Sequence, residues 1–163
     1  MFDQKRKISN QEGFSLVELM VTVAIIGIVS TIAIAGYLSW KPGYVFRGAV
    51  SQVRGDLNRA KMRAVETRRQ CRVVFNTNGY QIEDGDQVMN SANYNVTLVR
   101  TFADFPQVTI TDSGAAIVAG SEPTIIFSPR GTATLGSFRI EHPTAGAVDI
   151  AVNITGRVDV TWL

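Results

Sequence analysis

The single histidine of this 163-residue chain, His142, is the first residue to consider for catalysis. It stands between Glu141 and Pro143, and the sequence has no second histidine for a two-histidine metal site. The Gly-x-Ser-x-Gly motif, which presents the nucleophilic serine of many hydrolases, does not occur in the sequence. We therefore predict that His142 is a surface turn residue and that the protein is not an enzyme.

Three acidic residues around Gly85 could bind a calcium ion, because Ca²⁺ prefers oxygen ligands and an acidic loop can supply them. The same residues are also typical of a turn whose carboxylates are simply solvated, and we favour this alternative. The residues are Glu83, Asp84 and Asp86. We predict no metal ion and no cofactor.

The one cysteine, Cys71, could have a reactive thiol because Arg69 and Arg72 stand close to it in the sequence. We expect a partly buried structural thiol instead. A single cysteine also excludes an intramolecular disulfide and a cysteine metal cluster.

A carboxylate stands at the start of a long apolar segment, and this is the most unusual feature of the sequence. Residues 19–40 have no charged side chain. As a helix they would extend ~33 Å, enough to cross a bilayer core of ~30 Å. Glu18 precedes them, and an ionised carboxylate inside a membrane costs ~2.5 to 3.5 kcal/mol. Either Glu18 reaches the aqueous interface, or it pairs with a cation in the apolar phase.

The charges before the apolar segment predict its orientation. Lys5, Arg6 and Lys7 precede it, so the N-terminus should stay in the cytoplasm and the remainder of the chain should lie on the other side. The apolar run is also longer than the ~7 to 15 residues of a secretory signal peptide. We therefore expect a signal anchor.

Residues 13–19, GFSLVEL, with a basic leader before them and an apolar helix after them, resemble the type IV pilin and pseudopilin family. The resemblance implies that a prepilin peptidase removes residues 1–13, cutting between Gly13 and Phe14, and methylates the new N-terminal amine of Phe14. It further implies that Glu18 pairs with the N-terminal amine of a neighbouring subunit during filament assembly. Physically, the two buried charges would compensate each other.

A second helical segment should follow the membrane span. Residues 41–43, Lys-Pro-Gly, predict a kink or a short break. Apolar residues then recur every three or four positions, which predicts an amphipathic half-helix over residues 41–70. The members of this stripe are Phe46, Ala49, Val50, Val53, Leu57, Ala60 and Ala64.

This half-helix is strongly basic. Residues 47–72 contain eight basic residues against two acidic ones, a local net charge of +6, and the rest of the chain after residue 13 carries about −5. A row of cations on a helix can contact the phosphates of nucleic acid. Solvation, or contact with acidic patches of neighbouring subunits, is the alternative that we favour. The candidate DNA contacts are Arg54, Arg63, Arg68, Arg69 and Arg157.

Beyond Arg72 the hydrophobic period changes to two, which predicts about eight short strands. The strands are expected at 71–76, 80–83, 95–101, 107–111, 124–128, 137–142, 148–154 and 157–163. The pairs Asn78-Gly79 and Thr155-Gly156 predict tight turns. The expected fold is α+β, with a long N-terminal helix packed on a small antiparallel β-domain over residues 71–163.

Three further stretches are similar to the GspH/FimT branch of minor pilins and pseudopilins. They are LNRAKMRA at 57–64, FSPRG at 127–131 and ITGRV at 154–158. The resemblance implies a structural subunit that helps initiate or cap a type IV pilus or a type II secretion pseudopilus. It implies residence in the bacterial inner membrane, with residues 14–40 as the transmembrane and filament-core helix and the β-domain in the periplasm.

The same resemblance implies several partners: other pilins or pseudopilins, the prepilin peptidase, the inner-membrane assembly platform and membrane lipid. Some members of the branch bind DNA for natural transformation and carry a C-terminal Gly-Arg-x-Arg motif. Here the corresponding residues are Gly156, Arg157, Val158 and Asp159. The carboxylate of Asp159 would repel a phosphate, which argues against DNA binding through this motif.

Overall fold

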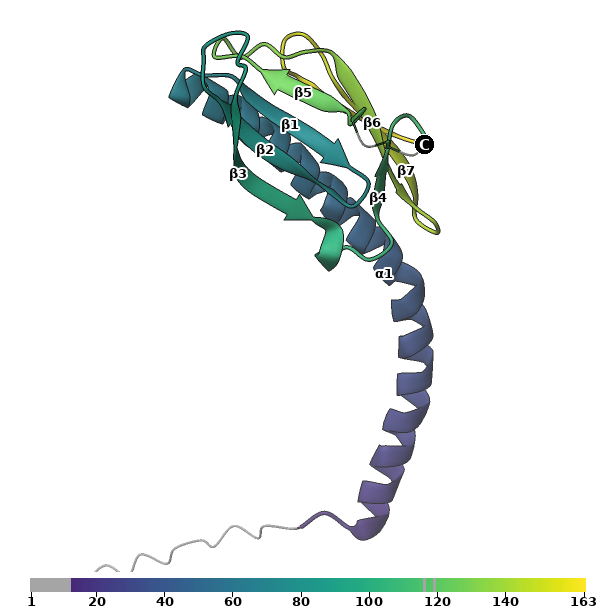
Figure 1. Cartoon of the computed structure of the whole chain (residues 1–163). Coiled ribbons are helices and arrows are strands. Elements are labelled where there is room, and N and C mark those ends of the chain that lie inside the picture. The colour runs from purple at the N-terminus through teal and green to yellow at the C-terminus, as the bar shows by residue number, and fades with distance from the viewer. Residues whose placement is uncertain (1–12, 116, 119) are drawn as a thin grey trace, which may run out of the picture. The chain divides into compact units, whose positions relative to one another are not determined.

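A computed structural model describes residues 13–115, 117–118 and 120–163. These residues form one long helix, α1 (Leu16–Thr67), followed by eight strands in two antiparallel sheets (Figure 1). The α+β fold predicted from the sequence is confirmed. The chain divides into two compact units between Trp40 and Lys41, so the apolar half of α1 and the domain that contains its second half are described separately below.

The eight predicted strands are all present, with ends that differ by a few residues. The first sheet has the order β3-β2-β1-β5 and the second has the order β4-β6-β7-β8. A short 3-10 helix, η1 (Phe102–Asp104), follows β3. The strands are β1 (Cys71–Asn76), β2 (Gly79–Gly85), β3 (Tyr94–Thr101), β4 (Thr109–Thr111), β5 (Thr124–Phe127), β6 (Gly136–His142), β7 (Gly146–Val152) and β8 (Val158–Trp162).

Of the kink or short break predicted at residues 41–43, the break is wrong, because α1 continues through Pro42 without interruption. A proline inside a helix lacks the N–H that would bond to the carbonyl four residues earlier. That loss affects one hydrogen bond, and the long helical stretches on both sides keep the backbone helical. The helix also ends at Thr67 rather than at residue 70, because Arg68 adopts a left-handed backbone conformation with φ +55°.

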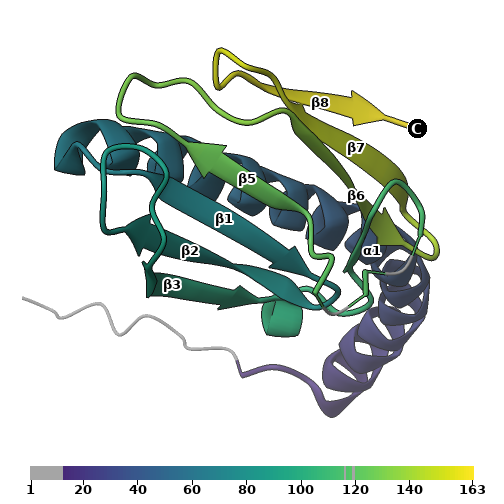
Figure 2. The same cartoon turned by 45° about the horizontal axis from the view of Figure 1, so that its top comes forward.

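The amphipathic stripe predicted on the second half of α1 is confirmed, since all seven of its apolar members are buried. Figure 2 shows this part of α1 running behind β1 and β5, with β6 and β7 beside it. Alternate residues of the strands face the same core, among them Val73, Ile140 and Ile150. The two sheets meet there through the rings of Phe75 and Phe138, which stack with centroids 4.0 Å apart.

Two glycines permit close approaches of the backbone. The β1–β2 hairpin is confirmed, but its loop is Thr77-Asn78, and Gly79 already pairs with Asn76. A Cβ atom on Gly79 would lie 2.1 Å from the carbonyl oxygen of Arg100 on β3. The predicted turn at Gly156 is also confirmed: φ is +69° there, and its N–H donates to the carbonyl of Asn153 at 2.8 Å.

Candidate functional site

The predicted processing site lies just before the start of α1. Gly13 and Phe14 precede the helix, and the side chain of Phe14 is 84% exposed. The bond between them is therefore outside regular secondary structure and accessible. The rest of the leader, residues 1–12, lies outside the described residues.

Glu18 lies in the first turn of α1, where the helix dipole favours a negative charge. Ser15 directly precedes the helix; its hydroxyl oxygen accepts the N–H of Val17 at 3.3 Å and its carbonyl accepts the N–H of Leu19 at 3.1 Å. Sequence reasoning missed this role of Ser15. The signal was present, because a serine followed three residues later by a glutamate is a common helix start.

The apolar half of α1 presents its hydrophobic side chains outward. Leucine, isoleucine and valine side chains between residues 16 and 34 are more than half exposed. The hydroxyls of Thr22, Ser30 and Thr31 donate back to carbonyls of their own helix at 2.7 to 2.8 Å. By length and composition α1 is able to cross a membrane. With these three hydroxyls satisfied internally, the surface between residues 16 and 34 is suited to lipid or to the apolar faces of other helices.

Arg63, one of the predicted DNA contacts, is engaged within the chain. Its guanidinium donates to both carboxylate oxygens of Asp84 on β2, with a shortest distance of 2.6 Å. This hydrogen bonding holds the pKa of Asp84 below its usual range. The pair joins α1 to the first sheet, so Arg63 has a structural role.

A second polar connection between α1 and the first sheet is centred on the buried carboxylate of Asp56. It accepts the hydroxyl of Tyr80 at 2.8 Å and the Nε–H of Arg100 at 3.1 Å. Burial, reinforced by this hydrogen bond, raises the pKa of Tyr80. A buried carboxylate is stable only with such partners, so these contacts fix the helix against β2 and β3.

The calcium site considered for the turn around Gly85 is not formed. Glu83 and Asp84 point to opposite faces of β2, since successive residues of a strand alternate. Glu83 is buried and ion-paired with Arg72, and Asp84 is bound by Arg63. The described residues contain no group of acidic, histidine and cysteine side chains that could hold a metal ion. The alternative of a solvated turn is also wrong for Glu83, because its partner Arg72 and the strand pairing place it inside.

The prediction that His142 is a surface turn residue is wrong. It is the last residue of β6 and is only 5% exposed. Its Nδ1 atom accepts the N–H groups of Thr144 and Ala145, each at 3.2 Å. The ring therefore closes the turn that follows β6, and its contacts explain its burial. The partner residues come after His142 in the chain, and the sequence alone did not indicate that its ring would turn back onto them.

Cys71 is a buried thiol at the start of β1. Burial, with a further contribution from the nearby carboxylate of Asp84, raises its pKa to about 12. A thiol with this pKa is protonated at neutral pH, so Cys71 is a structural residue and not a nucleophile.

Two of the remaining basic candidates are brought together. Arg54 and Arg157 line one groove, which also includes Lys61 and has a volume of about 510 Å³. We call it the basic groove. The Nζ of Lys61 donates to the carbonyls of Thr155 and Gly156, each at 3.2 Å. Arg68 and Arg69 lie at the end of α1 and do not line it.

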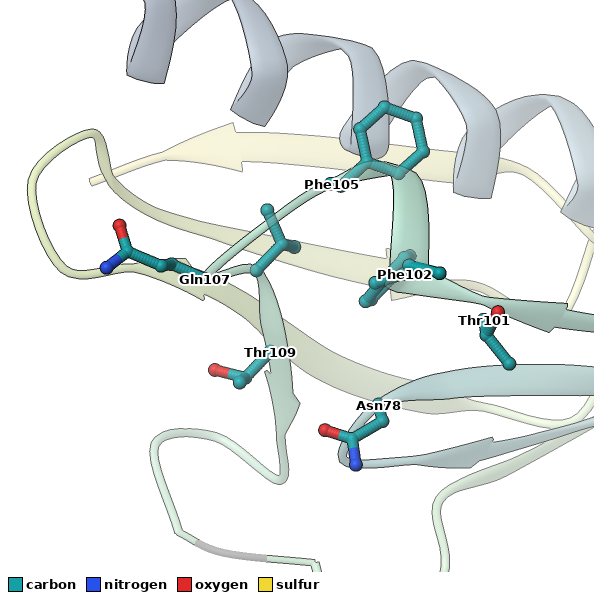
Figure 3. A pocket seen from close by; sticks show the side chains of 8 residues that line it. Asn78, Thr101, Phe102, Phe105, Gln107 and Thr109 are labelled. Carbon is teal, nitrogen blue, oxygen red and sulfur yellow. The ribbon is translucent and has the colours of Figure 1, made fainter.

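A second pocket, of about 440 Å³, lies beside η1 (Figure 3). Phe102 and Phe105 lie on one side of it, and Asn78, Gln107 and Thr109 surround it. Its lining contains no acidic, basic, histidine or cysteine side chain. The pocket therefore has no group for acid–base or nucleophilic chemistry.

Comparison with known proteins identifies the family. A family described as type II transport protein GspH matches residues 49–156, more than half of the chain. The chain belongs to the GspH family. A prokaryotic N-terminal methylation motif matches residues 8–34, which include Gly13, Phe14 and Glu18. The resemblance stated from the sequence is confirmed.

Curated relatives of this GspH family member are fimbrial proteins. A type IV major fimbrial protein FimA of Dichelobacter nodosus is 30% identical over 141 residues, which cover 76% of the chain and 87% of that protein. A second FimA of the same organism is 44% identical over 59 residues, 36% of the chain and 35% of that protein. No solved structure matches the chain. Membership of the type IV pilin and pseudopilin superfamily makes the protein a membrane-anchored structural subunit.

Proposed function

We propose that this protein is a minor pilin or pseudopilin that helps initiate or cap a type IV pilus or a type II secretion pseudopilus. One observation carries the proposal: Glu18 lies in the first turn of an exposed apolar helix, four residues after Phe14. Such a helix cannot remain in water, and its carboxylate needs a cation once other helices surround it.

The proposed sequence of events follows from these residues. The precursor is held in the inner membrane with its N-terminus in the cytoplasm and residues 71–163 in the periplasm. The prepilin peptidase cuts the bond between Gly13 and Phe14 and methylates the amine of Phe14. The assembly platform then moves the helix out of the bilayer and into a filament, where Glu18 pairs with the amine of a neighbouring pilin.

Processing is tested by the intact mass of the protein extracted from membranes. We expect a chain of residues 14–163 that carries one additional methyl group. Cells that lack the prepilin peptidase are the control and should yield the full precursor. A protein that retains residues 1–13 in cells with an active peptidase would contradict the proposed cleavage.

The role in initiation or capping is tested by counting surface pili on cells that lack the gene, with the restored gene as control. Loss of pili, recovered on restoration, is expected if the subunit helps start or cap a pilus. Normal piliation combined with loss of type II secretion would assign it to a pseudopilus. If piliation and secretion both remained normal, the proposed role would be wrong.

DNA binding by a minor pilin of natural transformation receives less support from the geometry. Arg63 is bound by Asp84, and the guanidinium of Arg157 pairs with the carboxylate of Asp159 at 2.8 Å. Arg68 and Arg69 lie outside the basic groove. A phosphate in the groove would meet the carboxylate of Asp159, which weakens its attraction to Arg157.

A further inference from the structure

The basic groove has one wall from a helix and one from a strand. Arg54, Asn58 and Lys61 come from α1, and their spacing of four and three residues places them on one side of the helix. The other wall is formed by the turn at Gly156 and by β8, which contributes residues 158–160. The groove therefore runs between a row of polar and basic side chains and the last strand of the second sheet.

The charge of the groove is positive. Arg54, Lys61 and Arg157 contribute three cations, and Asp159 contributes the one carboxylate of the lining. That carboxylate pairs with Arg157, and Lys61 donates to two backbone carbonyls. Within the described residues, Arg54 forms no ion pair with a carboxylate. The guanidinium of Arg54 is thus available to an anionic ligand.

The strand wall offers backbone hydrogen bonds, because β8 is the outermost strand of its sheet. The N–H of Leu163 donates to Ala147 and the carbonyl of Arg157 accepts from Asn153, each at 3.1 Å. In an antiparallel pair alternate residues bond to the partner strand. The N–H and C=O groups of Val160 and Trp162 therefore point away from β7, at the open edge of the sheet.

We propose that the basic groove binds an extended acidic segment of a neighbouring filament subunit, which adds as a strand to the edge of β8. Its backbone would pair with Val160 and Trp162, and its carboxylates would bind Arg54 and the outer face of Arg157. The charge distribution supports this occupant, because the chain after residue 13 carries about −5 outside residues 47–72. Copies of this chain thus carry an excess of carboxylates there, including the exposed residues Asp104 and Asp112. The choice of a subunit as partner rests on the proposed function.

A peptide is favoured over nucleic acid because the two walls offer different interactions. A strand edge pairs with a peptide backbone, whereas a phosphodiester chain has no N–H groups in register with it. The carboxylate of Asp159 also lies in the groove, where it can accept a peptide N–H, a donor that the phosphodiester backbone lacks.

The first test uses the full chain in detergent micelles and a fluorescein-labelled peptide of four Glu-Val repeats, with fluorescence anisotropy as the measurement. We expect saturable binding that R54Q and R157Q each weaken about tenfold, because each variant removes a charge-assisted hydrogen bond. R69Q is the matched control, since it removes the same charge outside the groove, and should bind as the unaltered protein does. Equal losses in R69Q and R54Q would show nonspecific attraction and overturn the proposal.

Two further probes test the manner of binding. A Glu-Val peptide with N-methylated backbone amides should bind several-fold more weakly, because it cannot add to β8. If it bound as well as the parent peptide, strand addition would be wrong. A single-stranded DNA that bound in place of the peptide, and lost affinity in R54Q and R157Q, would assign the groove to nucleic acid.

The identity of the partner is tested in cells with a photo-crosslinking amino acid in place of Asn58. We expect an adduct with an acidic segment of another pilin or pseudopilin, identified by mass spectrometry. An adduct with a protein of any other kind, or none at all, would contradict the proposed partner.

The peptide experiment does not depend on filament assembly. A failure of the proposed assembly function would therefore leave the result of the peptide experiment unchanged, and the two failures can be told apart.

Discussion

A protein with Glu18→Ala is expected to be inserted and processed normally and yet to be nearly absent from filaments. In the assembled state the substitution would leave the amine of a neighbouring Phe14 without its counter-ion among packed apolar helices. An unpaired buried charge costs about 3 to 5 kcal/mol, which corresponds to a loss of incorporation of about 100-fold or more. The measurement compares the amounts of the subunit in sheared filaments and in membranes.

The matched control is Ser30→Ala on the same apolar helix. The hydroxyl of Ser30 donates to the carbonyl of Ile26 at 2.7 Å, so its removal leaves no buried charge and should not affect incorporation. Glu18→Gln keeps the size of the side chain and removes the charge, and should fail nearly as severely as Glu18→Ala. Normal incorporation of Glu18→Ala would refute the assembly role of this carboxylate.

The periodic parts of the fold could be predicted because their signals are local. The stripe from Phe46 to Ala64 has the helical period, and every one of its members is buried against the sheets. The strands were recognised from their period of two and from their β-branched residues. The assembly role of Glu18 stays a prediction, made because a carboxylate beside a long apolar segment is costly unless it reaches water or pairs with a cation.

The parts that could not be predicted depend on which residues meet in three dimensions. Arg63 is separated from Asp84 by 21 residues, and no local pattern indicates that they pair. No local pattern indicates that Glu83 pairs with Arg72, the contact that argues against a calcium site at this turn. Nor does one indicate that the turn after β6 buries His142. Arg54 and Arg157 are far apart in the sequence, so the basic groove is also visible only in the fold.

The continuation of α1 through Pro42 has a different cause. Proline reliably removes one backbone hydrogen bond, but the outcome depends on the length of helix on each side. Here 26 residues of α1 precede Pro42 and 25 follow it. The cooperative stability of these two helical segments outweighs the preference of proline for a non-helical backbone. A break would be expected only where one of the two flanking segments was short.

Gly79→Ala is expected to have the largest effect on the stability of the folded domain. The new Cβ atom would lie 2.1 Å from the carbonyl oxygen of Arg100, a backbone atom that cannot rotate away. The β2–β3 pair would have to separate locally, which also disturbs the contact of Arg100 with Asp56. We expect the free energy of unfolding to fall by about 2 to 3 kcal/mol, which lowers the melting temperature by roughly 10 °C. Thermal unfolding monitored by near-ultraviolet circular dichroism measures this change.

The matched control for Gly79→Ala is Gly55→Ala, which should change stability in the opposite direction. Gly55 is an exposed helical residue, and a Cβ atom there would meet nothing within 4 Å. Alanine in place of a helical glycine reduces the entropy lost on folding and stabilises by about 0.5 to 1 kcal/mol. The two variants add the same methyl group. A lower melting temperature for Gly79→Ala and a higher one for Gly55→Ala would therefore show that the loss comes from the steric contact between β2 and β3, and not from replacing glycine with alanine in general. A melting temperature of Gly79→Ala equal to or above that of the unaltered protein would contradict this prediction. It would show that β3 can move away from β2 at this residue without a loss of stability.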